Sequence, residues 1–249
     1  MKVGVCMKRV PDTEARITIA GDSRTIDESG VEFIINPYDE IAVEVGLRLK
    51  EKHGGEVVMV CYGPEGSGPV IRKALAMGAD RAVHIVYRSA EHEPYQAARV
   101  LATALEEEKF DVILCGKQAV DDDSAQVGPM LAELLGMPCV TEASALEIEG
   151  DKVVVHKEIE GGEEVVEATL PAIVTCQKGI AEPRLPGLKG IMMSKKKPLA
   201  EKKVDEPGLL TEVIRLEYPP TRPPGRIVGE GVEAVGALIE ALKSEAKVL

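Results

Sequence analysis

The stretch DVILCGKQAVDDDSAQVGPMLAELLG, residues Asp111–Gly136, decides the fold class. It begins with a β-branched apolar run, Val112–Leu114, breaks at Cys115-Gly116, and passes through three consecutive aspartates. Apolar residues at helical spacing then follow up to Leu135. This order predicts a strand, a loop and the N-terminus of a helix. In an open parallel sheet, small molecules bind beyond the carboxyl ends of the strands, where a helix presents unpaired N–H groups.

The aspartates in this loop leave the type of ligand open. Phosphate is the usual ligand of such a turn, yet Asp121, Asp122 and Asp123 place negative charge where an anion would lie. One of them, or Ser124, is expected to cap the helix, because Asp123 with a glutamine three residues later resembles a capping box. Two interpretations follow. Either the carboxylates bind ribose hydroxyls while the N–H groups of about Ser124–Gly128 face a phosphate, or the stretch is an acidic capping turn without a ligand.

Composition limits the function classes. A chain of 249 residues with 45% hydrophobic content forms a sizeable core, either as one large α/β domain or as one domain with an extension. A net charge of −12 argues against non-specific nucleic-acid binding, and the absence of Trp leaves few platforms for base stacking. The segment Lys189–Lys203 is an exception, because it holds six lysines and one glutamate.

No membrane span and no secretion signal are expected. The chain has no apolar run near 18 residues, and its start, MKVGVCMKRV, is too short and too charged for a signal peptide. We therefore expect a cytoplasmic location.

The five cysteines predict core packing. They contain no C-x-x-C pair, which argues against a zinc ribbon or a thioredoxin-type motif. Cys6, Cys61, Cys115 and Cys176 each fall near the last residue of a predicted strand, where small apolar side chains pack closely. The four histidines are scattered along the chain. We therefore predict no catalytic residue and no metal ligand.

The first part of the chain alternates buried strands with helices, which predicts parallel pairing and a doubly wound sheet. A β-hairpin excursion is expected within Ile17–Ile34. The expected strands are Lys2–Met7, Val57–Cys61, Ala82–Val86 and Val112–Leu114; the expected helices run from Asn36 to Lys52, from Ser67 to Met77 and over Tyr95–Glu108.

The pattern changes after Pro138. Ala143–Glu149, Lys152–Glu160 and Glu164–Leu170 alternate apolar and polar residues and predict antiparallel strands, with one more buried strand at Pro171–Cys176. From Gln177 to Arg226, prolines and glycines recur too often for a continuing compact core. This composition predicts either a disordered linker or an extended arm.

The chain closes with an amphipathic helix. Val232–Leu249 carries Val235, Leu238, Ile239 and Leu242 on one face. Apolar residues on the arm and on this helix predict a permanent partner subunit. We expect an α/β domain over residues 1–180, and a loop and extended arm ending in this helix over residues 181–249.

Six segments in collinear order resemble the beta subunit of electron-transfer flavoprotein. They cover most of the first 200 residues, and their combination is specific although no single one is decisive. The segments are Val5–Asp12, Ile35–Ala42, Ala74–Asp80, Gly116–Pro129, Val155–Thr175, and Glu182–Met192 followed by Lys195–Lys197.

The resemblance implies an electron-carrier subunit and not an enzyme. Such subunits form a heterodimer with a larger alpha subunit, which holds most of the FAD and on which the C-terminal helix would pack. The beta subunit holds a structural AMP, and this favours ligand binding by the aspartate loop. The AMP site maps onto Cys6, Asn36, Pro37, Tyr38, Asp39, Tyr62, Gln118, Asp121, Asp122, Asp123, Ser124, Ala125, Gln126, Val127 and Gly128.

The resemblance also implies docking of redox partners, which are acyl-CoA or other dehydrogenases and a quinone-linked oxidoreductase. The matching family segment carries a leucine that enters an apolar pocket of the dehydrogenase, and here this residue is Leu188. Glycine and proline around it predict a loop that projects into solvent. Arg184, Lys195, Lys196 and Lys197 are the further partner-binding residues.

Two alternatives remain. A bifurcating branch of the family places a second FAD in the AMP pocket, but typically has D-G-D where this chain has three aspartates. A non-redox adenine-nucleotide-binding enzyme or module is the other alternative. An enzyme of that kind needs a Gly/Ser-rich loop after the first strand, and this strand is followed by Lys8, Arg9, Val10 and Pro11.

Overall fold

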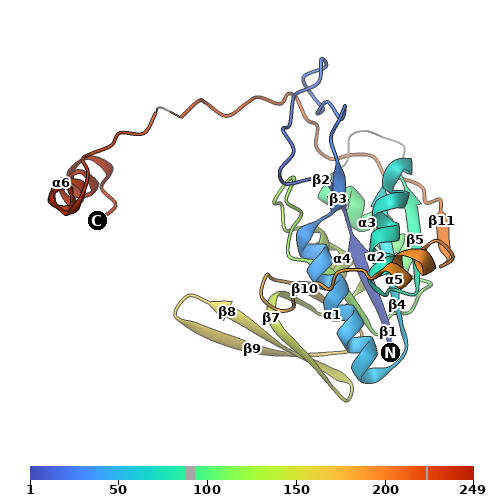
Figure 1. Ribbon diagram of the computed structural model, residues 1–249. Helices are drawn as coiled ribbons and strands as arrows, with labels where there is room; N and C mark the ends of the chain where they lie inside the picture. Colours follow the sequence, from blue (N-terminus) through green and yellow to red (C-terminus); the bar gives the residue numbers. More distant parts are fainter. Residues whose placement is uncertain (88–92, 223) are drawn as a thin grey trace. The chain divides into compact units, whose positions relative to one another are not determined.

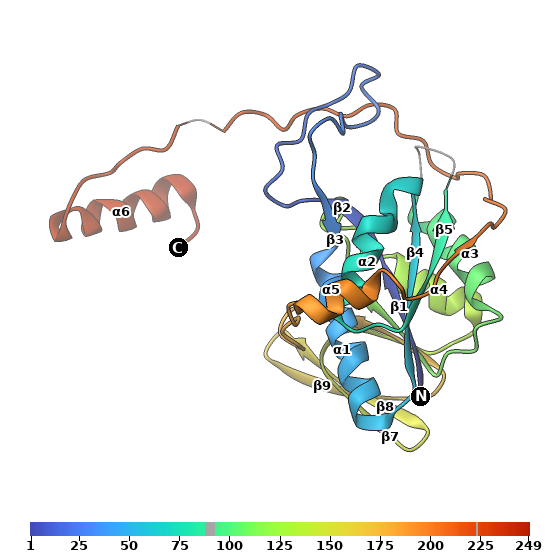
Figure 2. The ribbon, with the colours of Figure 1, turned by 45° about the vertical axis from the view of Figure 1, so that its right-hand side comes forward.

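The computed structural model describes residues 1–87, 93–222 and 224–249. They form two compact units, Met1–Arg215 and Leu216–Leu249. Figures 1 and 2 show the helices and strands of both.

The larger unit contains the elements that position the candidate site. Its strands are β1 Lys2–Met7, β2 Arg9–Pro11, β3 Phe33–Ile35, β4 Glu56–Gly63, β5 Arg81–Val86, β6 Val112–Gly116, β7 Cys139–Glu149, β8 Lys152–Ile159, β9 Gly162–Thr169, β10 Ala172–Cys176 and β11 Leu199–Lys202. Its helices are α1 Pro37–His53, η1 Glu65–Ser67, α2 Gly68–Met77, α3 Pro94–Leu105, α4 Val127–Leu135 and α5 Leu188–Ser194.

The sheet confirms the predicted α/β class. In the order β11-β5-β4-β1-β6-β10-β7-β8-β9, neighbours are parallel from β11 to β7, while β8 and β9 add antiparallel strands. From β1 the chain proceeds to β4 and β5 on one side, then crosses to β6 and β10 on the other. The strand order therefore reverses between β1 and β6. Ligands of open α/β sheets bind at such a point, outside the carboxyl ends of the strands.

Helices cover both faces of the parallel strands. Successive side chains of a strand point to opposite faces, so Val57 and Met59 pack in the cluster that contains α1 and α2. Val58 and Val60 pack in the cluster that contains α3 and α4. Strands buried on both faces read as continuous apolar runs, which is why the sequence marked them clearly.

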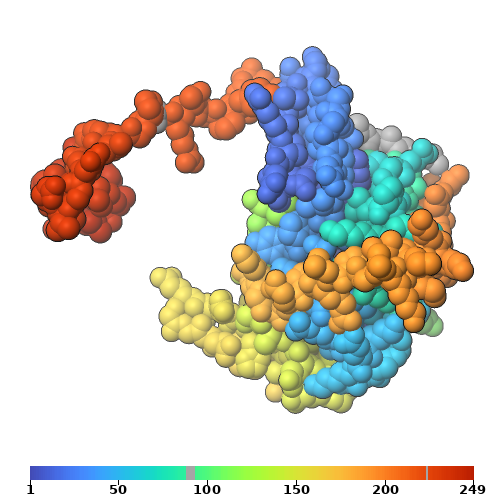
Figure 3. Space-filling model, viewed as in Figure 1, coloured from blue at the N-terminus to red at the C-terminus, as the bar shows by residue number. Residues whose placement is uncertain are grey.

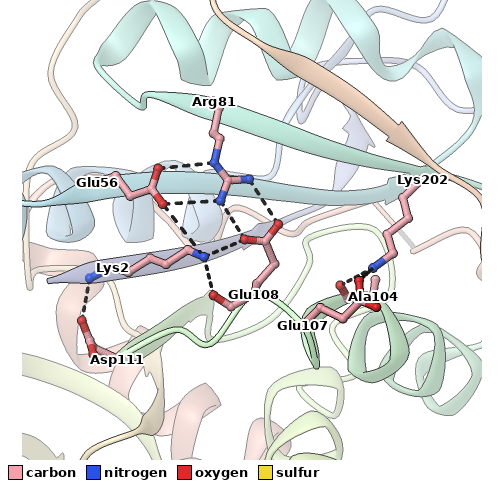
Figure 4. A network of polar contacts seen from close by, with 8 residues as sticks. All are labelled: Lys2, Glu56, Arg81, Ala104, Glu107, Glu108, Asp111 and Lys202. Atoms are coloured by element: carbon pink, nitrogen blue, oxygen red, sulfur yellow. Dashed lines mark hydrogen bonds and ion pairs between the residues drawn. The ribbon is translucent and has the colours of Figure 1, made fainter.

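Ion pairs join the amino ends of the strands (Figure 4). The Lys2 ammonium lies 2.8 Å from Glu108 Oε2, and the Arg81 guanidinium lies 2.7 Å from the same carboxylate and 3.3 Å from Glu56. The hydrogen bond from Arg81 outweighs partial burial and lowers the pKa of Glu108 to about 2. The Lys2 N–H donates to Asp111 at 2.6 Å. The amino edge of β1, β4 and β5 is thereby fastened to the turn before β6.

The β-hairpin excursion lies between β1 and α1. β2 and β3 pair antiparallel at its base, and an isolated antiparallel bridge joins Ile19 to Ile26 within it. The Arg9 guanidinium lies 3.2 Å from the centre of the Phe33 ring. This cation–π contact ties the two strands at the base.

The prediction that the core ends at Gln177 was wrong for part of the tail. β11 extends the parallel sheet, with Leu199 opposite Ala82 of β5. α5 packs against α2, and the Arg72 guanidinium binds the carbonyl oxygens of Ser194 and Lys197. These contacts join residues more than 100 positions apart, so local composition did not reveal them. The functional boundary after residue 180 stays a prediction.

The smaller unit, Leu216–Leu249, ends in consecutive helical turns. They are η2 Val232–Ala234, α6 Val235–Ala241 and the π-type turn η3 Leu242–Ala246. An ion pair of 2.9 Å joins Arg226 to Glu245. The expected amphipathic helix is present, and none of the side chains on α6 is buried.

Within residues 1–87, 93–222 and 224–249, no helix combines the length and hydropathy that crossing a membrane requires.

Candidate functional site

The buried carboxylate of Asp39 organises the carboxyl edge of the sheet at the reversal point. It lies in the first turn of α1, which begins with Pro37 after Asn36. The backbone N–H of Lys8, directly after β1, donates to Asp39 Oδ2 at 2.8 Å. The N–H of Gly116, at the end of β6, donates to Oδ1 at 2.9 Å. One side chain therefore joins α1 to both strands that border the reversal point.

Burial sets the charge of Asp39. Loss of solvent raises its pKa to about 7, although the N–H of Lys8, the Asn36 side chain and the N–H of Gly116 oppose the shift. The approach of helix and strand also requires glycine at position 116, because a Cβ there would lie 2.4 Å from Asp39 Oδ1.

Asn36 holds the loop that follows β6. Its Nδ2 donates to the Gln118 carbonyl oxygen at 2.8 Å, and the Val120 N–H donates to its Oδ1 at 3.1 Å. The side chain is 1% exposed and makes no capping bond to α1. Asn36 directly precedes α1, but its side-chain amide binds the loop instead of capping the helix.

Lys8 is the counter-ion of the aspartate loop. Its ammonium lies 2.8 Å from Asp121 and 3.0 Å from Asp122. Burial alone would lower the pKa of Lys8, but the two carboxylates outweigh burial and raise it. Burial likewise acts to raise the pKa of Asp122, but the charge of Lys8 and hydrogen bonds from Lys8 and Ser124 outweigh burial and lower this pKa. The cation thus compensates part of the negative charge in the loop.

The expectation that an aspartate or Ser124 caps the next helix was wrong. α4 begins at Val127 with Gln126 as its N-cap residue and no side-chain cap. Asp123 and Ala125 adopt left-handed backbone angles, with φ of 50° and 53°. Asp123 accepts a hydrogen bond from Gln118 Nε2 at 2.7 Å. The aspartates are therefore turned toward the loop and Lys8.

The start of α4 presents open donors. Within the described residues, the N–H groups of Gln126, Val127 and Gly128 donate to no protein acceptor. Pro129 follows in the first turn, where its missing N–H interrupts no helical bond. A Cβ on Gly128 would lie 2.6 Å from Thr175 Cγ2, so glycine lets the helix start pack closely on β10.

An apolar wall lies at the same edge of the sheet. Cys6, Tyr62 and Cys115 belong to the apolar cluster on the α3 and α4 face, and Val127 packs against it. The Tyr62 ring meets the Tyr87 ring edge to face, with centroids 5.3 Å apart. Wall, donors and carboxylates together fit a nucleoside monophosphate, whose base, phosphate and ribose need these three kinds of contact.

The predicted cofactor residues thus come from elements that meet at one edge. Cys6 is the penultimate residue of β1, and Asn36 directly precedes Pro37, Tyr38 and Asp39 in the first turn of α1. Tyr62 lies near the end of β4, and Gln118–Gly128 leads from β6 into α4. Sequence reasoning missed Lys8 as the counter-ion of the loop. Its position directly after the first strand was the available signal, since the carboxyl ends of parallel strands share one edge.

Two predicted partner-binding residues are bound within their own unit. The Arg184 guanidinium lies 2.7 Å from Glu44, which is buried, and 2.6 Å from Glu51. The Lys197 ammonium donates to the Leu75 carbonyl oxygen at 2.9 Å and to that of Ala79 at 2.6 Å. Lys197 thereby satisfies carbonyl groups at the end of α2.

The predicted loop around Leu188 is a helix from that residue onward. Leu188 is the first residue of α5 and is 83% exposed, while Leu185 is 92% and Met192 71% exposed. A Cβ on Gly190 would lie 2.3 Å from the Ala76 carbonyl oxygen, so this glycine seats α5 against α2. In Figure 3 the segment crosses the surface as an orange band. Exposed Lys195 and Lys196 follow at its end.

The cysteines at the strand ends are packing residues, as predicted. Cys6, Cys61, Cys115 and Cys176 are buried. Burial and the nearby Asp39 raise the pKa of Cys61 and of Cys176 to about 12, so both stay protonated thiols. In the part of the chain that the structure describes, no three Cys, His, Asp or Glu residues are grouped to hold a metal.

Comparison with known proteins identifies similar chains. A family model described as the electron transfer flavoprotein domain matches residues 23–207. Electron transfer flavoprotein subunit beta of Bacillus subtilis strain 168 is 43% identical over the full length of both chains. The protein of the same name from Bradyrhizobium diazoefficiens is 46% identical over the full length of both. That of Homo sapiens is 43% identical over 98% of this chain and 97% of its own.

We expect Asp39→Asn to lower the free energy of unfolding by about 1–2 kcal/mol at pH 5, because its amide nitrogen has no lone pair for the second backbone N–H. The folded-state pKa of about 7 exceeds the ordinary 3.8. The folded protein therefore binds more protons between these values, and the contribution of Asp39 to stability falls as pH rises from about 4 to about 7. Asparagine does not titrate, so the variant lacks this pH dependence, and the difference in the free energy of unfolding between wild type and variant should narrow toward pH 8.

Chemical denaturation at fixed protein concentration measures the free energy of unfolding of wild type and variant at pH 5 and at pH 8. Glu40→Gln is the matched control, because Glu40 lies in the same turn and pairs with Lys73 instead of with backbone N–H groups. If the difference in the free energy of unfolding between wild type and Asp39→Asn stays constant or widens from pH 5 to pH 8, the raised pKa of Asp39 is contradicted.

Proposed function

This chain belongs to the electron transfer flavoprotein family as a beta subunit, and we propose that it holds a structural AMP at the carboxyl edge of its sheet. A larger alpha subunit carries most of the FAD, and the flavin supplies the electron-accepting and electron-donating chemistry. The chain itself acts as a scaffold and docking subunit. The observation that carries the AMP proposal is the group of open N–H donors at the start of α4, beside the aspartates that Lys8 compensates.

Each part of AMP has a matching set of residues. The N–H groups of Gln126, Val127 and Gly128 bind the phosphate, which the positive end of the α4 dipole also favours. The carboxylates of the aspartate loop accept hydrogen bonds from the ribose hydroxyls. The base lies against the apolar wall of Cys6 and Tyr62.

Charge compensation makes the phosphate compatible with the acidic loop. Two carboxylates of the loop hold Lys8, so the loop next to α4 carries less net negative charge than its sequence indicates. Asn36 and Asp39 fix the position of the loop through their hydrogen bonds to the backbone of Gln118 and Gly116. Lys8, Asn36 and Asp39 act on the backbone and on charge, and no covalent step is required of them.

The smaller unit supports the proposal of an alpha-subunit partner. On α6, Val235, Leu238 and Ile239 are exposed together at helical spacing. An apolar helix face without a cover in its own unit is typical of an interface with another chain. We assign this face to the alpha subunit.

The surface around α5 supports the docking of redox partners. Leu185, Leu188 and Met192 are exposed on a segment that Arg184 and Lys197 hold to α1 and α2. A rigid base and a projecting apolar tip suit an anchor in a partner pocket. Lys195 and Lys196 would steer an acidic partner surface, such as the rim of a dehydrogenase pocket or a quinone-linked oxidoreductase.

We expect Gln126→Trp to lower the AMP content of the purified complex by at least about half, because a large side chain at the N-cap position crowds the phosphate donors. Glu133→Trp is the matched control on the exposed side of the same helix. Nucleotide released by acid is measured by chromatography, together with the flavin absorption. Equal AMP content in both variants would remove the start of α4 from the site.

We expect Leu188→Ala to slow reduction of the flavin by a partner dehydrogenase about 5- to 150-fold at subsaturating concentration, as loss of an apolar anchor commonly costs about 1–3 kcal/mol. AMP content, FAD content and thermal stability should change little. Leu134→Ala, an exposed leucine on α4, is the control. Unchanged kinetics with every dehydrogenase tested, or a large loss of stability, would assign Leu188 to packing within its own unit.

A further inference from the structure

The segment Val204–Glu212 follows β11 and runs along the carboxyl edge of the larger unit (Figure 2). The Tyr62 hydroxyl donates to Glu206 Oε1 at 3.1 Å, and Gln96 Nε2 donates to the Pro207 carbonyl oxygen at 2.8 Å. The Leu210 N–H donates to Glu93 Oε1 at 2.7 Å. The segment is thus held to β4 and to the start of α3 by three side chains.

These three side chains are polar and buried. Tyr62, Gln96 and Glu93 each keep less than a tenth of their surface in solvent. Buried polar groups need partners, so the segment satisfies groups that would otherwise be costly to bury. Val204 adds an apolar contact with the cluster that contains Cys6 and Tyr62. The segment therefore packs against the apolar wall of the candidate nucleotide site.

Glu206 fixes the orientation of the Tyr62 ring. Burial, and then the negative charge and hydrogen bond of Glu206, raise the pKa of Tyr62, so its hydroxyl stays protonated and donates. Tyr87 meets the ring from another side, edge to face. A ring held at its hydroxyl and at its edge has little freedom to rotate into or away from the site.

We infer that Glu206 is a positioning residue for the nucleotide site, and that Val204–Glu212 forms the outer wall that must detach before the nucleotide leaves. The inference rests on the proposed function, because it takes AMP as the ligand. It extends the site to a segment that none of the predicted cofactor residues includes. An ion pair of 2.9 Å between Glu212 and Arg24 fastens the far end of the segment to the hairpin excursion.

Exchange of bound AMP tests the inference directly. The complex with the large subunit is purified with its natural nucleotide and diluted into excess AMP labelled with heavy isotopes. Mass spectrometry then follows replacement of light AMP by heavy AMP. The variants are Glu206→Ala, Glu206→Gln and Tyr62→Phe, and the double variant Tyr62→Phe with Glu206→Ala. Asp205→Ala is the control, because it removes the same charge from the exposed neighbour.

We expect Glu206→Ala and Tyr62→Phe each to speed exchange about tenfold, the effect of losing one hydrogen bond to a charged acceptor. Glu206→Gln keeps an acceptor oxygen and should stay within about threefold of wild type. The double variant should exchange no faster than Tyr62→Phe, because that substitution already removes the contact with Glu206, together with the longer one of 3.4 Å to Gln96. Asp205→Ala should match wild type.

Three results would overturn the inference while AMP is still present in the complex. The first is exchange at the wild-type rate in Glu206→Ala and Tyr62→Phe. The second is equal acceleration of exchange by Asp205→Ala, which would indicate a general effect of charge. The third is fast exchange in Glu206→Gln, which would indicate a general effect of packing. A wild-type complex without AMP would instead contradict the proposed function, so the two failures are distinguishable.

Discussion

A single buried carboxylate, that of Asp39, holds together the edge on which the candidate site is built. It accepts one hydrogen bond from the N–H of Lys8, directly after β1, and one from the N–H of Gly116, the last residue of β6. The strand order reverses between these two strands. The neighbouring Asn36 then fixes the loop after β6. Because Asn36 directly precedes α1 and Asp39 lies in its first turn, the start of one helix sets the position of the aspartate loop that leads to α4.

The two edges of the parallel sheet differ in how their charged groups are paired. The amino edge of the sheet is closed by ion pairs around Glu108, whereas at the carboxyl edge Lys8 compensates the aspartates and the start of α4 keeps its donors open. On an acidic chain, exposed Leu188 and Met192 lie on α5, and exposed Lys195 and Lys196 follow at its end. The proposed binding edge and the proposed docking surface therefore occupy different parts of one unit, and a substitution in one makes no direct contact with the other.

Features set by local patterns were predictable from the sequence. Buried strands such as β1 and the helix after Asn36 follow from apolar runs and from Pro37, and the family resemblance brought Tyr62 and the aspartate loop into one predicted site. Features set by distant contacts were not predictable. Asp123 does not cap α4, because left-handed turns and Gln118 direct it elsewhere. α5 is held by the hydrogen bond from Arg72 to the Ser194 carbonyl oxygen, and β11 forms by pairing with β5. Lys197 likewise binds a distant group, the Leu75 carbonyl oxygen near the end of α2.

The nucleotide content of the complete complex distinguishes a structural AMP from a second FAD. The chain is co-expressed with its large flavoprotein partner, the heterodimer is purified without added nucleotide, and the nucleotides released by acid are separated by chromatography. The account predicts one AMP and one FAD per heterodimer. Two FAD and no AMP would contradict the AMP assignment and place the chain in the bifurcating branch, and a complex that carries FAD but no second nucleotide would contradict the site itself.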